Sequence, residues 1–332
     1  MKKFFDRHET YVFIAIILFS ILFTIINPRF FTLENGFDLL KSYAMVGIFS
    51  LGMLIVIISG GIDLSFMAIA TVCGYISAML LTNYGEKLNI VFIFMLASVI
   101  GILLGSVNAI VIHFFKIAPI ISTIATQNIF FGLLMFFSKG KWLQGFPDWF
   151  RKFADIKFFA LTSSEGSPYG LSIVTIIFFV LVILTALFLR YTTLGKSIYA
   201  LGGNVISAKR AGMNIFGLQV FVYGFMGFIA GIGSIIQLLL VNASAPNSLV
   251  GKELGVIAAV VIGGASLAGG TGSIIGTLLG VVLISIMGNG LTLMRVPSIY
   301  INIIIGFFIL ISIGASRYRM KKSQYQRIII EQ

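Results

Sequence analysis

The sequence predicts an all-α, polytopic membrane protein with about ten transmembrane helices. Of its 332 residues, 58% are hydrophobic and only 10% are charged, which leaves too little polar surface to coat a water-soluble protein of this size. The mean hydropathy is +1.07. Apolar stretches of membrane-spanning length also recur along the chain, separated by short polar segments. Most of the protein surface must therefore face lipid.

The apolar stretches divide into ten expected spans, each close to the roughly 20 residues that a transmembrane helix needs. They lie at 11–27, 43–59, 65–82, 90–112, 120–138, 170–190, 217–240, 253–269, 273–289 and 299–315. The first is read as a retained span, because Asn27 and Pro28 follow it without the small residues of a signal-peptide cleavage site. An even number of spans places both termini on the same side.

Basic residues favour a cytoplasmic location for both termini. This assignment puts 13 of the 23 Lys and Arg residues inside and the other ten outside, a modest preference in the direction of the positive-inside rule. The net charge of +12 is then explained by contact with anionic lipid headgroups. We expect membrane lipid as a partner and no nucleic acid.

The longest expected external loop covers residues 139–169 and is rich in aromatic side chains. These are Trp142, Phe146, Trp149, Phe150, Phe153, Phe158 and Phe159. They can form an interfacial aromatic belt or a docking surface for an external partner.

The second half of the chain repeats features of the first in the same order. The segment Gly61–Leu64 followed by Ala68 resembles Gly251–Leu254 followed by Ala258, with an acidic residue at the same place. Leu103–Gly105 likewise matches Leu278–Gly280, and Pro119 and Pro297 follow at similar distances. These matches relate spans 2–5 to spans 7–10, and a shift of five spans inverts the orientation in the membrane. Inverted repeats are typical of transporters, in which the solute path lies between the halves.

Asp63 is flanked by apolar spans, where an acid facing lipid would cost roughly 2.5 to 3.5 kcal/mol. The segment Ser59–Ser65 predicts a break between two helices, with Asp63 or Ser65 available to cap the second helix or to contact solute. Glu253 has the matching position before the eighth span. Capping is the simpler role for both acids.

Other polar residues within the spans are hydrogen-bond partners between helices or contacts for solute. The residues expected at the substrate pathway or at a helix break are Asp63, Ser65, Asn108, Gln127 and Glu253. With two histidines and one cysteine, the sequence offers no catalytic residues, no metal site and no cofactor site. The triplet Gly195-Lys196-Ser197 lacks the earlier glycine of a P-loop, so any ATP hydrolysis must come from a partner.

Residues 191–216 form a polar loop between the sixth and seventh spans. Its glycines permit tight turns, and Lys196, Lys209 and Arg210 favour the cytoplasmic side. We expect a compact projection that couples the membrane spans to an ATPase.

Three segments resemble the signatures of the ribose-type ABC transporter permease family. They are Thr192–Asn204 with its continuation to Met213, Ser59–Ser65 and Val261–Ser273. The resemblance extends from about residue 27 to 315. It departs from many relatives at Phe66 and Met67, which leaves the shape of the solute site open.

The resemblance implies that residues 1–332 form one transmembrane permease domain in a bacterial cytoplasmic (inner) membrane. It also implies three partners: ABC ATPase subunits, an external substrate-binding protein, and a second permease copy or a paralogue. The expected solute is of the ribose, xylose, galactose or autoinducer-2 class. The residues expected in the ATPase coupling loop are Gly195, Lys196, Gly202, Gly203, Asn204, Arg210 and Gly212.

Other functions are compatible with parts of the sequence. A nucleoside ABC importer permease would share the family signatures. An ion-coupled secondary transporter would also have an inverted repeat and an acid at a helix break. A membrane scaffold or receptor would use the aromatic loop to bind a partner. Neither of the last two accounts for the glycine-rich polar loop.

Overall fold

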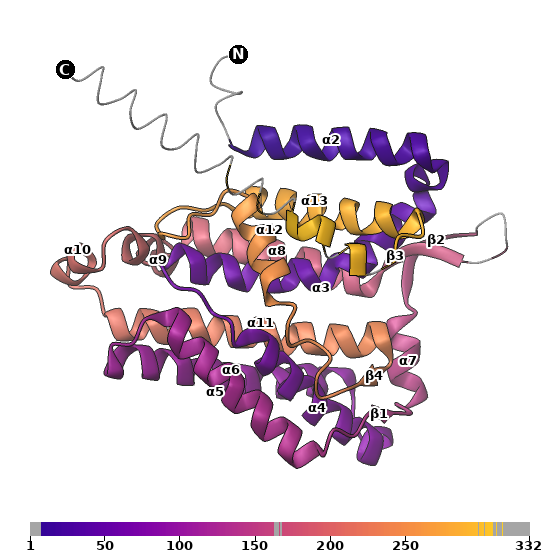
Figure 1. Cartoon of the computed structure of the whole chain (residues 1–332). Helices are drawn as coiled ribbons and strands as arrows, with labels where there is room; N and C mark the ends of the chain where they lie inside the picture. Colours follow the sequence, from indigo (N-terminus) through magenta and orange to yellow (C-terminus); the bar gives the residue numbers. More distant parts are fainter. Residues whose placement is uncertain are drawn as a thin grey trace, which may run out of the picture.

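The computed structural model describes residues 8–162, 166, 168–297, 299–301, 303–307, 310 and 314. Long helices lie side by side along one direction, with two short helices projecting at one end and a small two-stranded sheet at the other (Figure 1). The expected all-α membrane fold is confirmed.

The helices and strands follow one another along the chain from α2 to α13. They are α2 (His8–Ile26), η1 (Pro28–Phe31), α3 (Leu33–Ile58), α4 (Phe66–Tyr84), η2 (Gly85–Lys87), α5 (Ile90–Phe115), α6 (Pro119–Ser138), β1 (Leu143–Gln144), α7 (Asp148–Ala154), β2 (Lys157–Thr162), β3 (Pro168–Ser172), α8 (Ile173–Tyr191), α9 (Thr193–Gly203), α10 (Val205–Arg210), α11 (Ile215–Val241), β4 (Ala243–Ser244), α12 (Glu253–Ile262) and α13 (Ile274–Leu293).

Many helices begin at a Ser, Thr or Asn whose side chain accepts a hydrogen bond from a backbone N–H of the first turn. These N-caps are Thr32, Asn89, Ser172, Thr192, Asn204, Asn214 and Ser273. Each satisfies a backbone donor that would otherwise lack a partner at the helix end. Helix α6 begins instead with Pro119, which lacks the N–H that would need a partner.

Within the described residues, eight helices are long and apolar enough to cross a membrane: α2, α3, α4 with η2, α5, α6, α8, α11 and α13. The stretch 253–269, expected to be a span, contains only the ten-residue helix α12, followed by turns. The expected span 299–315 lies partly outside the described residues, and residues 1–7 and 315–332 lie wholly outside them.

The helices α3 and α11, of 26 and 27 residues, run antiparallel through the centre of the protein. Gly52 lies against Met226, and Phe49, one turn earlier on α3, lies against Gly233, two turns later on α11. Each helix is followed by a non-helical segment and then by a helix that starts inside the protein, α4 after α3 and α12 after α11. This is the arrangement expected of the inverted repeat.

Small residues let α5 and α11 approach until their backbones touch. A Cβ atom built on Gly101 would lie 2.0 Å from the carbonyl oxygen of Gly227, and one on Gly227 would lie 1.9 Å from that of Gly101. Helices α12 and α13 pack in the same way, because a Cβ atom built on Gly280 of α13 would lie 1.9 Å from the carbonyl oxygen of Ala259 of α12. The glycines spaced four apart therefore serve close helix packing.

The aromatic loop is partly folded into the protein. Phe146 and Phe150 are fully buried and pack edge to face, with ring centroids 5.6 Å apart, and the Trp149 indole donates a hydrogen bond to the carbonyl oxygen of Gly85. Trp142 and Phe159 remain exposed, at 61% and 85%. The buried part of the loop thus closes one end of the helix bundle, and only its exposed side chains are available to lipid or to a partner.

Candidate functional site

A hydrogen-bonded chain connects the first helix break to two neighbouring helices. The backbone N–H and the hydroxyl of Ser65 both donate to Oδ1 of Asp63, each at 2.7 Å. Asn108 of α5 donates to the Ser65 hydroxyl at 2.7 Å, and the Thr126 hydroxyl of α6 donates to Asn108 Oδ1 at 2.6 Å. All four residues are buried. These hydrogen bonds hold the start of α4 against α5 and α6.

Asp63 is fully buried although it is acidic. Its Oδ1 accepts both bonds from Ser65, whereas Oδ2 receives no hydrogen bond from any described residue. The bond from the N–H of Ser65 to Asp63 forms a turn just before α4, whose N-cap residue is Ser65 and has no capping hydrogen bond from its side chain. Capping of α4 by Asp63 therefore stays a prediction. Contact with solute stays a prediction.

Thr123 stabilises the extended part of the same break. Its hydroxyl accepts a hydrogen bond from the N–H of Leu64 at 3.1 Å and lies 3.2 Å from the carbonyl oxygen of Ile62, to which it donates. These bonds replace the helical hydrogen bonds that the break removes, as non-helical backbone at membrane depth requires.

The second break is held to α6 as well. Glu253 is buried, and its Oε1 accepts hydrogen bonds from the side chain of Gln127 and from the backbone N–H of Gly251, both at 3.0 Å. Thr126 contacts the first half through Asn108, and Gln127 contacts the second half through Glu253. Two adjacent residues of α6 therefore connect the helix breaks of the two halves.

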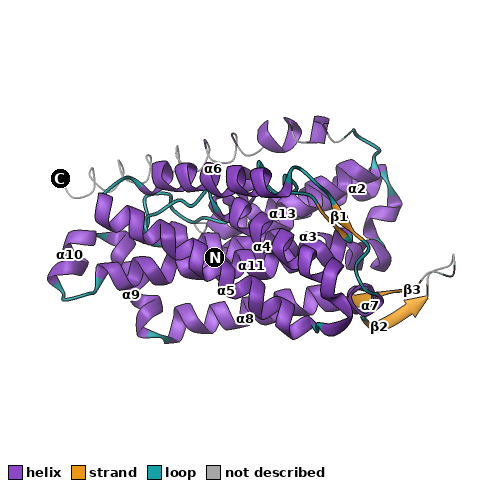
Figure 2. Cartoon of the chain, turned by 90° about the horizontal axis from the view of Figure 1, so that it is seen from below, coloured by secondary structure: helices purple, strands orange, loops and turns teal. Residues whose placement is uncertain are grey.

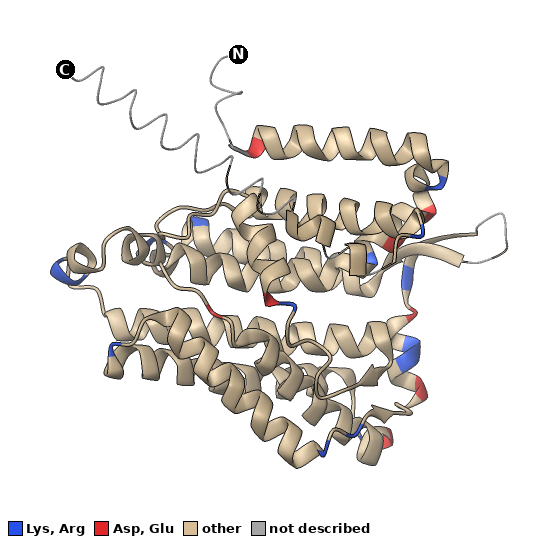
Figure 3. Cartoon of the chain, in the orientation of Figure 1, with Lys and Arg blue, Asp and Glu red and all other residues tan. Residues whose placement is uncertain are grey.

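An exposed polar surface lies beside these contacts, at the level of the middle of α6. Asn128 of α6 and Lys252, immediately before α12, are both exposed, and so is Asn247 in the segment that leads to α12. Leu254 on the first turn of α12 is 71% exposed. We call Asn128, Asn247, Lys252 and Leu254 the mid-depth face. Most charged residues lie instead at the ends of the long helices, and the pair at the start of α12 is an exception (Figure 3).

The polar loop 191–216 folds into the helices α9 and α10, which project from one end of the bundle (Figure 1). The Thr192 hydroxyl caps α9 by accepting from the N–H of Gly195, and the Asn204 side chain caps α10 by accepting from the N–H of Ser207. Gly195 is packed against the end of α8, where an added Cβ would lie 2.6 Å from the carbonyl oxygen of Phe188.

At the other end of α9, Gly202 is inserted between the turns of the two halves. An added Cβ would lie 1.8 Å from the carbonyl oxygen of Ile58 and 2.7 Å from the backbone nitrogen of Gly270. The N–H of Gly270 donates to that Ile58 oxygen at 2.8 Å, and the Tyr199 hydroxyl donates to the carbonyl oxygen of Gly272 at 2.9 Å. We call this contact of Ile58, Gly202 and Gly270 the glycine junction.

The other residues expected to couple to an ATPase lie on the outer surface of this projection. Gly203, Asn204, Lys196, Arg210 and Gly212 are exposed, and an added Cβ on Gly203 or Gly212 would have no neighbour within 4 Å. Of the seven residues expected to couple to an ATPase, Gly195 is buried and Gly202 is tightly packed. The other five are exposed and can contact a partner.

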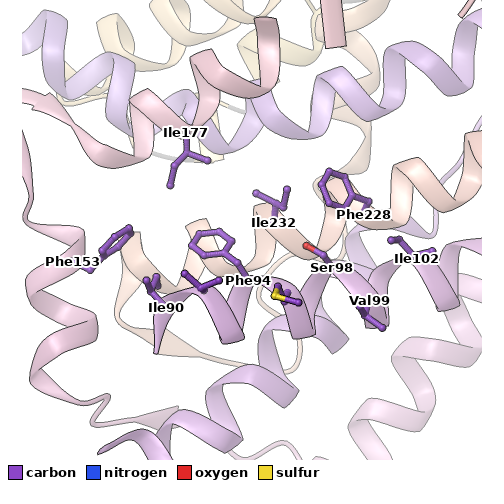
Figure 4. A pocket seen from close by; sticks show the side chains of 11 residues that line it. Ile90, Phe94, Ser98, Val99, Ile102, Phe153, Ile177, Phe228 and Ile232 are labelled. Atoms are coloured by element: carbon purple, nitrogen blue, oxygen red, sulfur yellow. The ribbon is translucent and has the colours of Figure 1, made fainter. Parts of the chain in front are cut away.

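A cavity of about 650 Å³ is unsuited to a polyhydroxylated solute. It lies between α5, α7, α8 and α11, and its lining is apolar except for Ser98 (Figure 4). Sugar hydroxyls placed there would lose their hydrogen bonds to water without replacement. Helices α8 and α6 lie on opposite sides of the protein (Figure 2), so this cavity is separate from the mid-depth face.

The structure also shows participants that the sequence did not reveal. Thr123 and Thr126 were not singled out, because threonine in an apolar helix usually bonds its own backbone. Lys252 was counted among the ten basic residues expected outside. The depth of Lys252 follows from the ten-residue length of α12, which ends at Ile262. Hydropathy alone did not predict that end, because the apolar residues continue beyond it.

Comparisons with known proteins identify the family. A family model described as a branched-chain amino acid transport system permease component matches residues 35–313. The ribose import permease RbsC of Haemophilus influenzae is 32% identical over 307 residues, which are 92% of each chain. The RbsC of Escherichia coli K12 is 31% identical, covering 90% of this chain and 91% of its own.

A second group of relatives has another solute in its name. The autoinducer 2 import permease LsrC of Photorhabdus laumondii is 28% identical over 312 residues, which are 93% of this chain and 89% of its own. No solved structure matches the chain significantly. The model match covers most of the chain, and the RbsC matches extend over nearly all of it. The chain therefore belongs to the ribose-type ABC transporter permease family.

Proposed function

We propose that this chain forms the translocation pathway of an ABC importer for a sugar or a sugar-like solute. The observation that carries the proposal is the similarity to ribose import permeases over nine tenths of the chain. The description of the family model names branched-chain amino acids and no sugar. The sugar-like solute is therefore inferred from the names of the ribose and autoinducer 2 permeases.

The solute path is assigned to the mid-depth face. Exposed polar side chains halfway across a bilayer are costly in lipid, where Lys and Asp at a helix centre cost roughly 2.5 to 3.5 kcal/mol. Asn128, Asn247 and Lys252 are therefore expected to face water between two permease subunits. The buried residues Asp63, Ser65, Asn108 and Glu253, together with the half-buried Gln127, then position the helix breaks that line the path, and do not themselves bind solute.

The energy is supplied by ATPase subunits that bind α9 and α10. Movement of α9 would be transmitted through Gly202 to the turn after α3 and to the turn after α12, because it touches both. The chain itself is a transporter component and not an enzyme, and hydrolysis takes place on the partner. An external substrate-binding protein and a second permease, identical or paralogous, complete the complex.

The binding of the ATPase to α9 and α10 implies an orientation in the inner membrane. The side that carries α9 and α10 is the cytoplasmic side. The first turn of α2 lies on the same side. Its Glu9 accepts a hydrogen bond from the Ser273 hydroxyl, and the neighbouring Gly272 accepts one from Tyr199 of α9. The amino terminus is then cytoplasmic, and with the ten spans expected from the sequence the carboxyl terminus is cytoplasmic as well.

Reconstitution tests the proposal. The chain is co-expressed with its ATPase and binding protein, the ligand of the binding protein is identified by mass spectrometry, and uptake of that ligand into proteoliposomes is measured. We expect uptake that requires ATP and stops when the P-loop lysine of the ATPase is replaced. Uptake by the chain alone, driven by a proton or sodium gradient, would contradict the proposal and establish the secondary transporter. A nucleoside as the bound ligand would correct the solute class.

A further inference from the structure

Lys252 is an exposed cation halfway across the protein. It immediately precedes α12, whose ten residues extend about 15 Å to the turn at Gly263. The segment that follows this turn lies on the side that carries α9. In this segment the N–H of Gly270 donates to the carbonyl oxygen of Ile58, and the carbonyl oxygen of Gly272 accepts from the hydroxyl of Tyr199 in α9. Half of the roughly 30 Å hydrocarbon thickness separates Lys252 from that side.

The contacts of Glu253 place Lys252 at the same depth independently. Glu253 accepts its hydrogen bond from Gln127, which lies near the middle of the 20-residue helix α6. Exposure to lipid at this depth is costly for a lysine ammonium, so its charge favours water or a partner.

No acidic partner for Lys252 is present among the described residues. Their one salt bridge joins Arg151 to Asp148, in α7. The two acids at mid-depth, Asp63 and Glu253, are buried and accept hydrogen bonds from other groups. Glu253 in particular uses Oε1 for Gln127 and for the backbone of Gly251. The exposed charge of Lys252 is therefore not neutralised by any acid that the structure describes.

A second copy of this chain would not neutralise the path. The exposed acids of the described residues lie at or near the ends of the long helices. They are Glu34, Asp38, Glu86, Asp148 and Asp155. An identical subunit across a two-fold axis would bring a second Lys252 to the same depth and no exposed acid.

We propose that Lys252 forms a subsite for an anionic group, so that the solute carries a carboxylate or a phosphate beside its hydroxyls, as in a sugar acid. The subsite rests on the proposed function, because it lies on the mid-depth face assigned there to the solute path. The exposed side chains of Asn128 and Asn247 supply neutral hydrogen-bonding groups suited to the hydroxyls, although the Asn128 amide also donates to the carbonyl oxygen of Ile124 in its own helix.

Cysteine labelling measures the charge of this path without knowledge of the natural solute. The sequence has one cysteine, Cys73, which is buried and gives a low background. Leu254→Cys places a thiol two residues from Lys252 on an exposed position, and Asn128→Cys provides a second site. The assembled complex in proteoliposomes is treated with three methanethiosulfonates, bearing a sulfonate, a neutral hydroxyl or a trimethylammonium group, and each rate is divided by that for a small thiol in solution.

We expect the thiol at position 254 to react faster with the sulfonate than with the hydroxyl reagent, by on the order of 5-fold, and slowest with the cation. Adding Lys252→Met should abolish the preference, and Lys252→Arg should retain it. The matched control Lys87→Met, which removes an exposed lysine at the end of the bundle, should leave it unchanged.

The outcomes separate this inference from the proposed function. Thiols at positions 254 and 128 that react without preference for the anion, or with a preference that survives Lys252→Met, overturn the anionic subsite alone. Thiols that react with none of the charged reagents show that the face meets lipid, which overturns both the subsite and the assigned path. ATP-driven uptake of the ligand of the binding protein tests the importer separately.

Discussion

Gly202→Ala should uncouple the permease from its ATPase. The added Cβ would lie 1.8 Å from the carbonyl oxygen of Ile58 and 2.7 Å from the backbone nitrogen of Gly270. Both neighbours are backbone atoms, so no side-chain rotation can relieve the overlap. The junction must open, and the 2.8 Å hydrogen bond between Gly270 and Ile58 is then lengthened or lost.

The cost follows from two contributions. Overpacking of a close contact typically costs about 1–3 kcal/mol, and loss of a hydrogen bond about 1 kcal/mol. Together they give roughly 2–4 kcal/mol, concentrated at the contact between α9 and the two halves. The adjacent variant Gly203→Ala is the matched control, because its Cβ has no neighbour within 4 Å and an exposed substitution usually changes stability by less than about 0.5 kcal/mol.

The assay compares thermal unfolding of the purified complex and its ATPase rate with and without the loaded binding protein. Gly202→Ala should lower the unfolding temperature and reduce the stimulation of hydrolysis, while Gly203→Ala behaves as the wild type. If the two variants have the same unfolding temperature and the same stimulation, the glycine junction does not connect α9 to the membrane helices, and the mechanism based on it is refuted.

Three further substitutions test other contacts. Asp63→Asn should be tolerated better than Asp63→Leu in complex yield and uptake, because Asn keeps an oxygen for the N–H of Ser65; equal loss would show that the charge is needed. Gly203→Trp should insert normally but lose ATPase co-purification, since it adds bulk to an exposed surface; wild-type uptake would exclude this surface as the docking site. Gln127→Leu should lower stability by about 1–3 kcal/mol because it removes a donor to buried Glu253, and an unchanged unfolding temperature would argue against that contact.

The fold was largely predictable from the sequence, because hydropathy and length determine which segments enter a bilayer. The expected stretches at 90–112, 120–138 and 217–240 lie within α5, α6 and α11. The stretch 253–269 was assigned too much helix, because its apolar residues continue into turns where Gly263 and Gly264 end α12. Hydropathy does not record where a chain turns.

The candidate site was predictable in part. Asp63 and Glu253 were identified because an acid between apolar spans is costly, and the structure places Asp63 in the segment just before α4 and Glu253 as the first residue of α12. The links from Ser65 to Asn108 and from Asn108 to Thr126 join residues 43 and 18 positions apart, so they depend on tertiary packing. The depth of Lys252 likewise depends on where α12 starts.

The neighbouring contacts of Thr126 and Gln127 on α6 bear on how the two helix breaks move during transport. Rotation of this helix would strain a hydrogen bond to each half at the same moment. The two halves are then linked in free energy, so that a change in one alters the cost of a change in the other. A rearrangement that moves one helix break independently of the other would have to lose at least one of these contacts. The two breaks are therefore expected to move together during transport.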